Sequence, residues 1–332
     1  MNKTDFKGKG EEYFRIWIVN TLLSIVTLGI YSAWAKVKNR KYLYQNLSIN
    51  NHRFDYHAQP IQILKGRLIA IFTLFLVTSL GVVNPIIYVL STIAFIFLAP
   101  WLINKSLSFN MRMTSYRNVR FDFQGDYWNT FIWIFIAPAL SIITLYLALP
   151  HFLRKRDEYL ISNYKFGNRS FNCSLSSSEY YKAVFSALGA VLGIGVILAI
   201  LGFIFATVIA NGEILNILLI VLGYILSIAT FASVYGAVIR NHQFNNSKID
   251  GVADFQSTIK IGDYLVLIFT NLLMIIFSLG LAIPFVQIRT MKFLSENTLV
   301  NTQREVENII DDISHDSSAL ADEVADAFDI EM

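Results

Sequence analysis

Few side chains in this sequence have the types and spacing that catalysis or metal binding requires. His52 and His57 flank Asp55 and could form a small metal site, although histidines in a polar loop are more often simply solvated. No His-Glu-x-x-His motif is present, and Cys173 is the only cysteine, so a thiolate cluster is excluded. We therefore expect no catalytic residues, no metal, no cofactor and no enzyme activity.

Two asparagines, Asn20 and Asn271, are the strongest candidates for a functional site. Each lies within an apolar stretch, and an amide in lipid must find its hydrogen-bond partners inside the protein. The pair could coordinate an ion or a polar solute, or each amide could hold two helices together. We favour the helix-joining interpretation and leave the ligand interpretation open.

The composition shows which kind of protein must position these amides. Of 332 residues, 55% are hydrophobic and 15% are charged, against about 45–50% and about 25% in soluble domains. One cysteine excludes a disulfide scaffold, and 14% aromatic residues exclude disorder over most of the chain. An integral membrane protein remains.

Hydrophobic stretches long enough or nearly long enough to cross a bilayer occur along the whole chain. A crossing helix needs about 20 apolar residues, and the candidate stretches are 13–35, 66–83, 85–103, 129–150, 183–207, 214–238 and 264–286. The pairs within 66–103 and 183–238 form tight hairpins, and Gly189-x-x-x-Gly193 predicts a helix-packing face in the second. We predict an all-α polytopic membrane protein with about seven hydrophobic helical segments.

One unit recurs three times, at about 5–57, 122–174 and 255–302. It consists of an apolar span, a basic aromatic segment and a short polar stretch. Pro150 and Pro284 align with Ala33, so we expect the span to end near 29–33 and a second, short helix to begin there. With the two hairpins, the three units form a membrane domain over 1–302, followed by a tail over 303–332.

Aromatic and basic residues alternate in the segment after each span, as in helices that lie at the lipid headgroups. The residues expected at this interface are Trp34, Lys38, Arg40, Lys41, Tyr42, Lys155, Tyr159, Arg289 and Lys292. Period-two alternation predicts short strands outside the membrane at 48–56, 108–113 and 119–123.

The chain resembles the YjgN-like family of bacterial inner-membrane proteins over about residues 5–300. The motifs that carry the resemblance are Phe6-x-Gly8-x-Gly10-Glu11, Asn20, Thr27-Leu28-Gly29-Ile30-Tyr31-Ser32-Ala33-Trp34, Arg40-x-Tyr42 and Gly66-Arg67. The resemblance implies a multi-pass helical protein of the bacterial inner (cytoplasmic) membrane. The family has no known function, so no activity and no site residues are implied, and the tail lies outside the resemblance.

The topology has two solutions. If all seven stretches cross, Lys and Arg outside the tail divide equally between the two sides, and the second unit is inverted as in many transporters. If the three repeated spans instead enter and return, with turns near Asn20, Pro138 or Asn271, all 27 basic residues lie on one side. We leave both open.

The distribution of charged residues along the chain indicates which binding partners to expect. The tail holds ten acidic residues and one basic residue, so the remaining chain carries a net charge of +12 and should attract anionic lipid rather than nucleic acid. The tail, with Val306, Ile309, Ile310 and Ile313 at helical spacing, could dock on this basic region or on a protein partner, and a homo-oligomer is open. Two functions fit: a small-solute transporter or channel, or a membrane-organising or lipid-interacting scaffold without transport.

Overall fold

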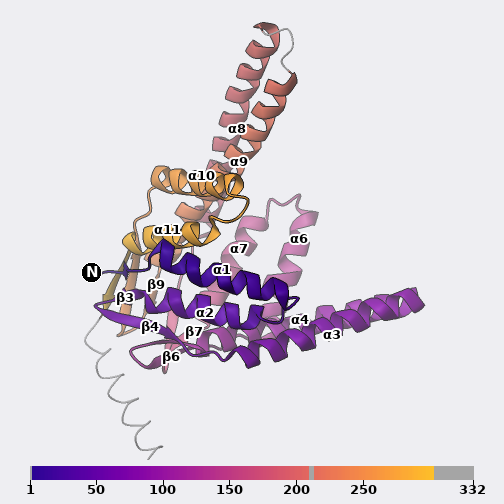
Figure 1. Ribbon diagram of the computed structural model, residues 1–332, viewed down its shortest axis with the longest axis vertical. Helices are drawn as coiled ribbons and strands as arrows, with labels where there is room; N and C mark the ends of the chain where they lie inside the picture. The colour runs from indigo at the N-terminus through magenta and orange to yellow at the C-terminus, as the bar shows by residue number, and fades with distance from the viewer. Residues whose placement is uncertain (1, 209–212, 303–332) are drawn as a thin grey trace, which may run out of the picture.

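The computed structural model describes residues 2–208 and 213–302 as helical hairpins attached to a ring of short strands (Figure 1). The prediction of an all-α protein is wrong, because the described residues include an 11-stranded antiparallel sheet. The strands have two to five residues each, so most are too short for hydrophobic alternation to reveal them.

Four strand hairpins and one further strand supply most of the ring. Their strands pair with their neighbours in chain order. They are β3 (Leu47–Ile49) and β4 (His52–Tyr56), β5 (Thr114–Tyr116) and β6 (Val119–Phe123), β7 (Tyr164–Phe166) and β8 (Arg169–Cys173), β9 (Ser247–Ile249) and β10 (Ala253–Ser257), and β11 (Thr298–Thr302).

The N-terminal residues close the sheet into a ring. Only Thr4 separates β1 (Asn2–Lys3), which pairs with β11, from β2 (Asp5–Phe6), which pairs with β3. Thr4 is buried, and its Oγ1 donates a hydrogen bond to the carbonyl of Ser295 at 2.7 Å. The first residues of the chain therefore join the last described strand to the first hairpin.

Apolar side chains from all the strand hairpins meet inside the ring. The buried cluster contains Tyr116, Val119, Phe166, Ile249, Val252, Ala253 and Val300. Phe54, Phe121, Phe171 and Phe255 pack against it. Because these residues come from positions as far apart as 49 and 300, burial of this cluster stabilises the ring as a whole.

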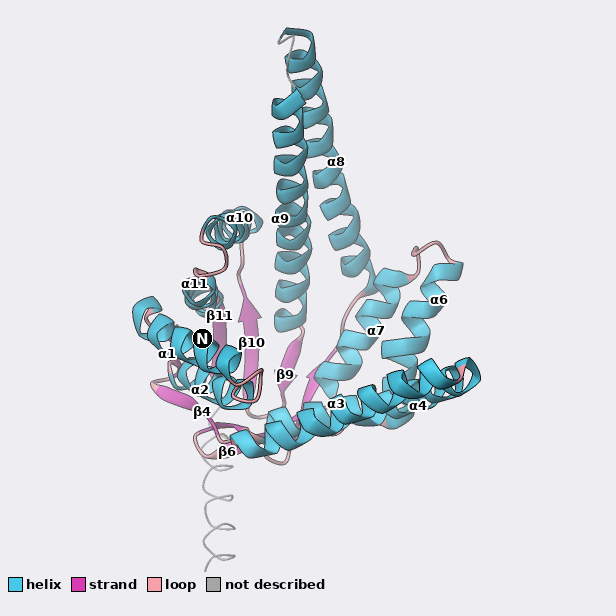
Figure 2. Ribbon diagram, turned by 45° about the vertical axis from the view of Figure 1, so that its right-hand side comes forward, coloured by secondary structure: helices cyan, strands magenta, loops and turns pink. Residues whose placement is uncertain are grey.

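Every strand hairpin is preceded by a helical hairpin. Three helical hairpins are short: α1 (Gly10–Val26) with α2 (Ser32–Gln45); α5 (Tyr127–Phe131), the π-helix η1 (Ile132–Ile136) and α6 (Ala137–Ile143) with α7 (Leu149–Ser162); and α10 (Ile261–Phe277) with α11 (Ile283–Glu296). Two are long: α3 (Pro60–Val83) with α4 (Pro85–Arg112), and α8 (Ser177–Val208) with α9 (Glu213–Asn245). Figures 1 and 2 show the two long hairpins leaving the ring in different directions.

Four helices in the described residues are long and apolar enough to cross a membrane, which corrects the prediction of about seven. They fall within 60–79, 85–112, 177–204 and 217–245. Asn84 separates the first pair, where its side chain accepts a hydrogen bond from the Ile86 amide and caps α4. The joint at 209–212 lies outside the described residues. The stretches 13–35, 129–150 and 264–286 are each interrupted by a turn.

Two local predictions need correction. The stretch 108–113 belongs to α4, apart from its last residue, and forms no strand. Phe109 and Met113 both pack against the cluster that contains Tyr56. They lie four residues apart, and a separation of four residues places two side chains on the same face of a helix. Gly189 and Gly193 were expected to form a packing face, but space around both positions is open in the described structure.

An ion pair on the outside of the ring makes its stability sensitive to acid. Burial alone would raise the pKa of Asp122, but hydrogen bonds from Arg112, the Phe123 amide and Ser108 outweigh it and lower that pKa to about 2. The Arg112 Nε lies 2.8 Å from the Asp122 carboxylate. A carboxyl group with a depressed pKa stabilises the fold above its unfolded pKa of about 4, and this contribution is lost as the pH falls through the folded value.

We expect Asp122→Asn to destabilise the protein by about 1 kcal/mol at neutral pH, because Arg112 is largely exposed. Thermal unfolding in detergent between pH 6 and pH 2 measures the effect. The difference from wild type should shrink as the pH falls. Asp55→Asn is the matched control, because Asp55 accepts hydrogen bonds from Gln45 and the Tyr56 amide at the corresponding place in β4. A constant difference across the whole pH range would contradict the prediction.

Candidate membrane-interaction surface

The turns that connect the short helical hairpins share one backbone conformation. Leu28 and Leu279 have positive φ values of 49° and 50°, and the glycine after each has φ of 90°. In the middle turn Leu145 and Tyr146 take the corresponding positive values, 49° and 64°. Only glycine adopts φ near +90° without strain, so the Leu-Gly pair of the sequence motif is explained by this turn.

The turns also satisfy their own backbone N–H groups. The second positive-φ residue of each turn donates to the carbonyl five residues earlier, as in a Schellman-type helix end; these bonds run from Gly29 to Ser24, from Tyr146 to Ser141 and from Gly280 to Ile275. A hydroxyl before each turn accepts from the amide four residues later: Thr27 from Tyr31, Thr144 from Ala148, and Ser278 from Ala282. N–H groups that are bonded within the protein suit a lipid environment, which offers them no partners.

The side chains at these turns are almost fully exposed and apolar. Leu28, Leu145 and Leu279 are 94%, 82% and 93% exposed. The apolar residues next to them are also exposed: Val26, Ile30, Ile143, Leu147, Phe277 and Leu281. We call these three groups the apolar tips. Three contiguous apolar groups on the ends of hairpins indicate a surface that water does not cover in the native setting.

Asn20 and Asn271 lie in α1 and α10, not at turns, and Pro138 lies in α6, so the expected turns near these residues are wrong. Asn20 is buried and donates from Nδ2 to Asn39 Oδ1 at 3.0 Å. That bond joins α1 to α2 within one hairpin.

Asn271 makes the corresponding contacts in the last short hairpin. Its Nδ2 donates to Thr290 Oγ1 at 3.1 Å, and its Oδ1 accepts from Arg289 at 3.2 Å. Thr290 is the residue that aligns with Asn39. The amides are therefore engaged in separate hairpins, α1–α2 and α10–α11, and the structure does not bring them together in one site.

Three of the expected interfacial residues hold the bases of hairpins. Arg40 donates to the Tyr56 hydroxyl at 3.1 Å and thereby ties α2 to β4. The Tyr42 hydroxyl accepts from the Lys9 amide at 2.9 Å, and the Tyr159 hydroxyl donates to the carbonyl of Asp126 at 2.9 Å. The two tyrosines occupy equivalent places and fix the entry to α1 and to α5.

The other expected interfacial residues are partly or fully exposed. Trp34 stacks on Tyr31 with ring centroids 6.0 Å apart, and Lys38 Nζ donates to the Tyr31 hydroxyl at 2.8 Å. Lys155 Nζ lies 3.9 Å from Glu158, and Lys41, Arg289 and Lys292 are exposed. Trp34 and Lys38 thus lie within about two turns of the first apolar tip, where aromatic and basic residues meet a headgroup region.

Sequence reasoning missed the apolar tips, although it aligned the residues that form them. Leu28-Gly29 matches Leu279-Gly280, and Thr27-Leu28 matches Thr144-Leu145. The shared leucine, in a segment between two helices, was the available signal. His57 was considered for a metal site; its Nε2 instead lies 2.7 Å from Ser115 Oγ. Within 2–208 and 213–302, no three His, Cys, Asp or Glu side chains gather as metal ligands.

Comparison with known proteins gives a consistent family match. The model of a family described as "bacterial protein of unknown function (DUF898)" matches residues 1–327. A protein of Escherichia coli O157:H7 named inner membrane protein YjgN is 27% identical over 88% of this chain and 87% of its own length. A Salmonella typhimurium protein of the same name is 32% identical over 62% of this chain and 48% of its length. No solved structure matches the chain.

Proposed function

Because this chain belongs to the DUF898 family of bacterial proteins of unknown function, we propose that it is a multi-pass inner-membrane protein that interacts with lipid and does not transport a solute. The resemblance to the YjgN-like family is confirmed by the family match and by the named relatives. The match reaches residue 327, so most of the acidic tail lies within the family, contrary to expectation.

The proposed topology follows from the two kinds of hairpin. The helices α3, α4, α8 and α9 cross the bilayer as two hairpins, and the three short hairpins enter one leaflet with their apolar tips and return. All strand hairpins then lie on one side. The tip turns and the joints at 83–85 and 210–213 contain no Lys or Arg, so the basic residues support a cytoplasmic ring.

We further propose that the chain is built from an internally repeated unit, a helical hairpin followed by a strand hairpin. Five helical hairpins precede the four strand hairpins and β11. In the fifth unit, the N-terminal strand β1 pairs with β11 and takes the place of a second strand. The shared turn geometry of the short hairpins supports a common unit.

The engaged asparagines argue against a polar transport site. Asn20 and Asn271 have hydrogen-bond partners in their own hairpins, so a solute would have to displace bonds that hold α1 to α2 and α10 to α11. Absence of enzyme activity remains a prediction.

The observation that carries the proposal is the three exposed apolar tips on turns whose N–H groups are bonded within the protein. Single nitroxide labels at Val26→Cys, Ile143→Cys and Phe277→Cys, in a Cys173→Ser background in proteoliposomes, test it. We expect high accessibility to oxygen and low accessibility to a nickel chelate, as in lipid. Lys248→Cys on the ring is the control and should show the reverse.

The same proteoliposomes, loaded with rubidium or with a small sugar, should leak no faster than protein-free vesicles. If the labels at the apolar tips are accessible to the nickel chelate, the proposal of lipid interaction is contradicted. Protein-dependent flux that is lost in Asn20→Leu/Asn271→Leu would restore the transport hypothesis.

A further inference from the structure

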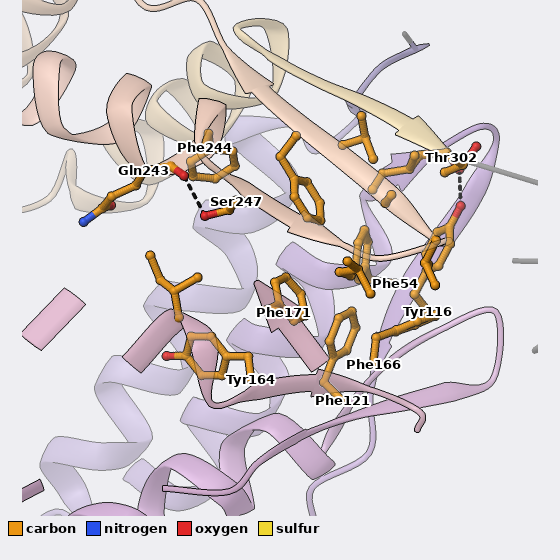
Figure 3. Close-up of a pocket in the computed structure, with 17 residues that line it drawn as sticks. Phe54, Tyr116, Phe121, Tyr164, Phe166, Phe171, Gln243, Phe244, Ser247 and Thr302 are labelled. Carbon is orange, nitrogen blue, oxygen red and sulfur yellow. Dashed lines mark hydrogen bonds between the residues drawn. The ribbon is translucent and has the colours of Figure 1, made fainter. Parts of the chain in front are cut away.

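The ring encloses a cavity that the proposed membrane contacts do not use. Its volume is about 390 Å³, within the range of about 300–1,000 Å³ that is usual for small-molecule sites. Figure 3 shows aromatic side chains from successive strand hairpins around it, including Phe54, Tyr116, Phe121 and Phe171. A lining of this kind offers water few hydrogen bonds, and it gains dispersion contacts from an apolar occupant.

Three of the polar side chains in the lining, those of Gln243, Ser247 and Thr302, already have hydrogen-bond partners. Gln243 Nε2 donates to Asp157 at 2.8 Å and lies 3.1 Å from the hydroxyl of Tyr180. Ser247 Oγ donates to the carbonyl of Gln243 at 2.6 Å, and Thr302 Oγ1 accepts from Asn50 at 2.8 Å. A polar ligand would lose its hydrogen bonds to water and find few in return. The lining therefore selects an apolar ligand.

The position of the cavity indicates where that ligand comes from. The lining includes Ile161 near the end of α7 and Phe244 near the end of α9, and it extends to Val252 and Thr302 at the far end of the strand hairpins. One end of the cavity thus lies at the base of α9, one of the four membrane-capable helices. Lipid is the abundant apolar molecule next to such a helix.

We propose that the strand ring binds one acyl chain of a membrane lipid, inserted from the base of the helical hairpins. The proposal rests on the proposed membrane contact for the source of the lipid, and on the cavity itself for the site. The chain would lie among aromatic faces in a space closed laterally by the sheet. The ring would then act as a holder for a lipid tail outside the hydrocarbon core of the bilayer.

Photo-crosslinking of the full-length protein in nanodiscs tests this proposal. The probe is a phosphatidylethanolamine with a diazirine near the end of one acyl chain, and labelled peptides are mapped by mass spectrometry. We expect label on peptides that contain β4, β6 and β8, in addition to label on the long helices. Two cavity-filling variants, Phe121→Trp and Ala253→Phe, should each lose the strand label and keep the helix label. Phe72→Trp, at an exposed position of α3, is the matched control and should keep both.

The outcomes separate the two proposals. Label on the apolar tips without label on the strands would overturn the acyl-chain site and leave the membrane contact standing. Label on neither would overturn both. Strand label that both filling variants retain would place the lipid outside the cavity. If the strands are labelled in Ile309→Asp/Ile310→Asp but not in wild type, the tail that follows Thr302, and not a lipid, occupies the cavity of the wild-type protein.

Discussion

Replacing Phe6 by alanine is expected to open the strand ring and to cost about 3–5 kcal/mol of stability. Phe6 is 5% exposed and packs against Tyr13 and Ile288, so its side chain connects β2 to both the first and the last short hairpin. Its ring lies over Gly8, where a Cβ atom would be 2.6 Å away. The Phe-x-Gly spacing is therefore explained by packing of the aromatic ring against the glycine backbone, where a side chain would not fit.

Hydrogen exchange of the full-length protein in detergent, together with thermal unfolding, measures this effect. In Phe6→Ala, the amides of β3 and β11 should lose protection before those of β6 and β7, because only the former pair with the N-terminal strands. Phe72→Ala is the control, since Phe72 is 62% exposed and should change stability by less than about 0.5 kcal/mol. Equal effects of the two substitutions would contradict the role of Phe6 in closing the ring.

Introducing aspartate at all three apolar tips is expected to expel the short hairpins from the bilayer without unfolding them. Leu28, Leu145 and Leu279 are too exposed for their replacement to disturb packing. In lipid, each aspartate would cost up to about 3 kcal/mol, with the full cost at the bilayer centre. The triple variant should therefore unfold at the same temperature as wild type in detergent but differ from it in membranes.

The readout is a nitroxide at Ile30→Cys in proteoliposomes, with Cys173→Ser in the background. Its oxygen accessibility should fall, and its accessibility to a nickel chelate should rise, in the triple aspartate variant. Leu28→Ala/Leu145→Ala/Leu279→Ala shortens the same side chains without adding charge, and should leave the label in lipid. An unchanged label depth in the aspartate variant would show that the tips do not meet the membrane.

The sequence predicted features that depend on neighbouring residues. The helix break expected near 29–33 lies between Val26 and Ser32, and the predicted strand at 119–123 coincides with β6. Proline and left-handed glycine act locally, so their positions reveal turns directly. The helical hairpin around Asn84 was recognisable for the same reason.

The ring could not be predicted because its determinants are distant in sequence. Asn2 and Lys3 pair with Val300 and Leu299, and no local sequence pattern indicates that these distant residues pair. For the apolar span that contains Asn20, crossing and re-entry both stayed open, because hydrophobicity alone does not distinguish the two. The partners of Asn20 and Asn271 required the hairpin geometry, since each lies 19 residues away on the returning helix.

The place where the ring closes also sets an order of assembly. During synthesis the first six residues emerge at the start, yet β11, which completes their pairing, ends at Thr302. Until then the nascent chain carries two open sheet edges, which other strands can join. Each helical hairpin can enter the membrane before the strands that follow it have all found their pairing partners. The ring can therefore close only after all the helical hairpins have been synthesised, and a chain cut short before β11 would keep unpaired sheet edges.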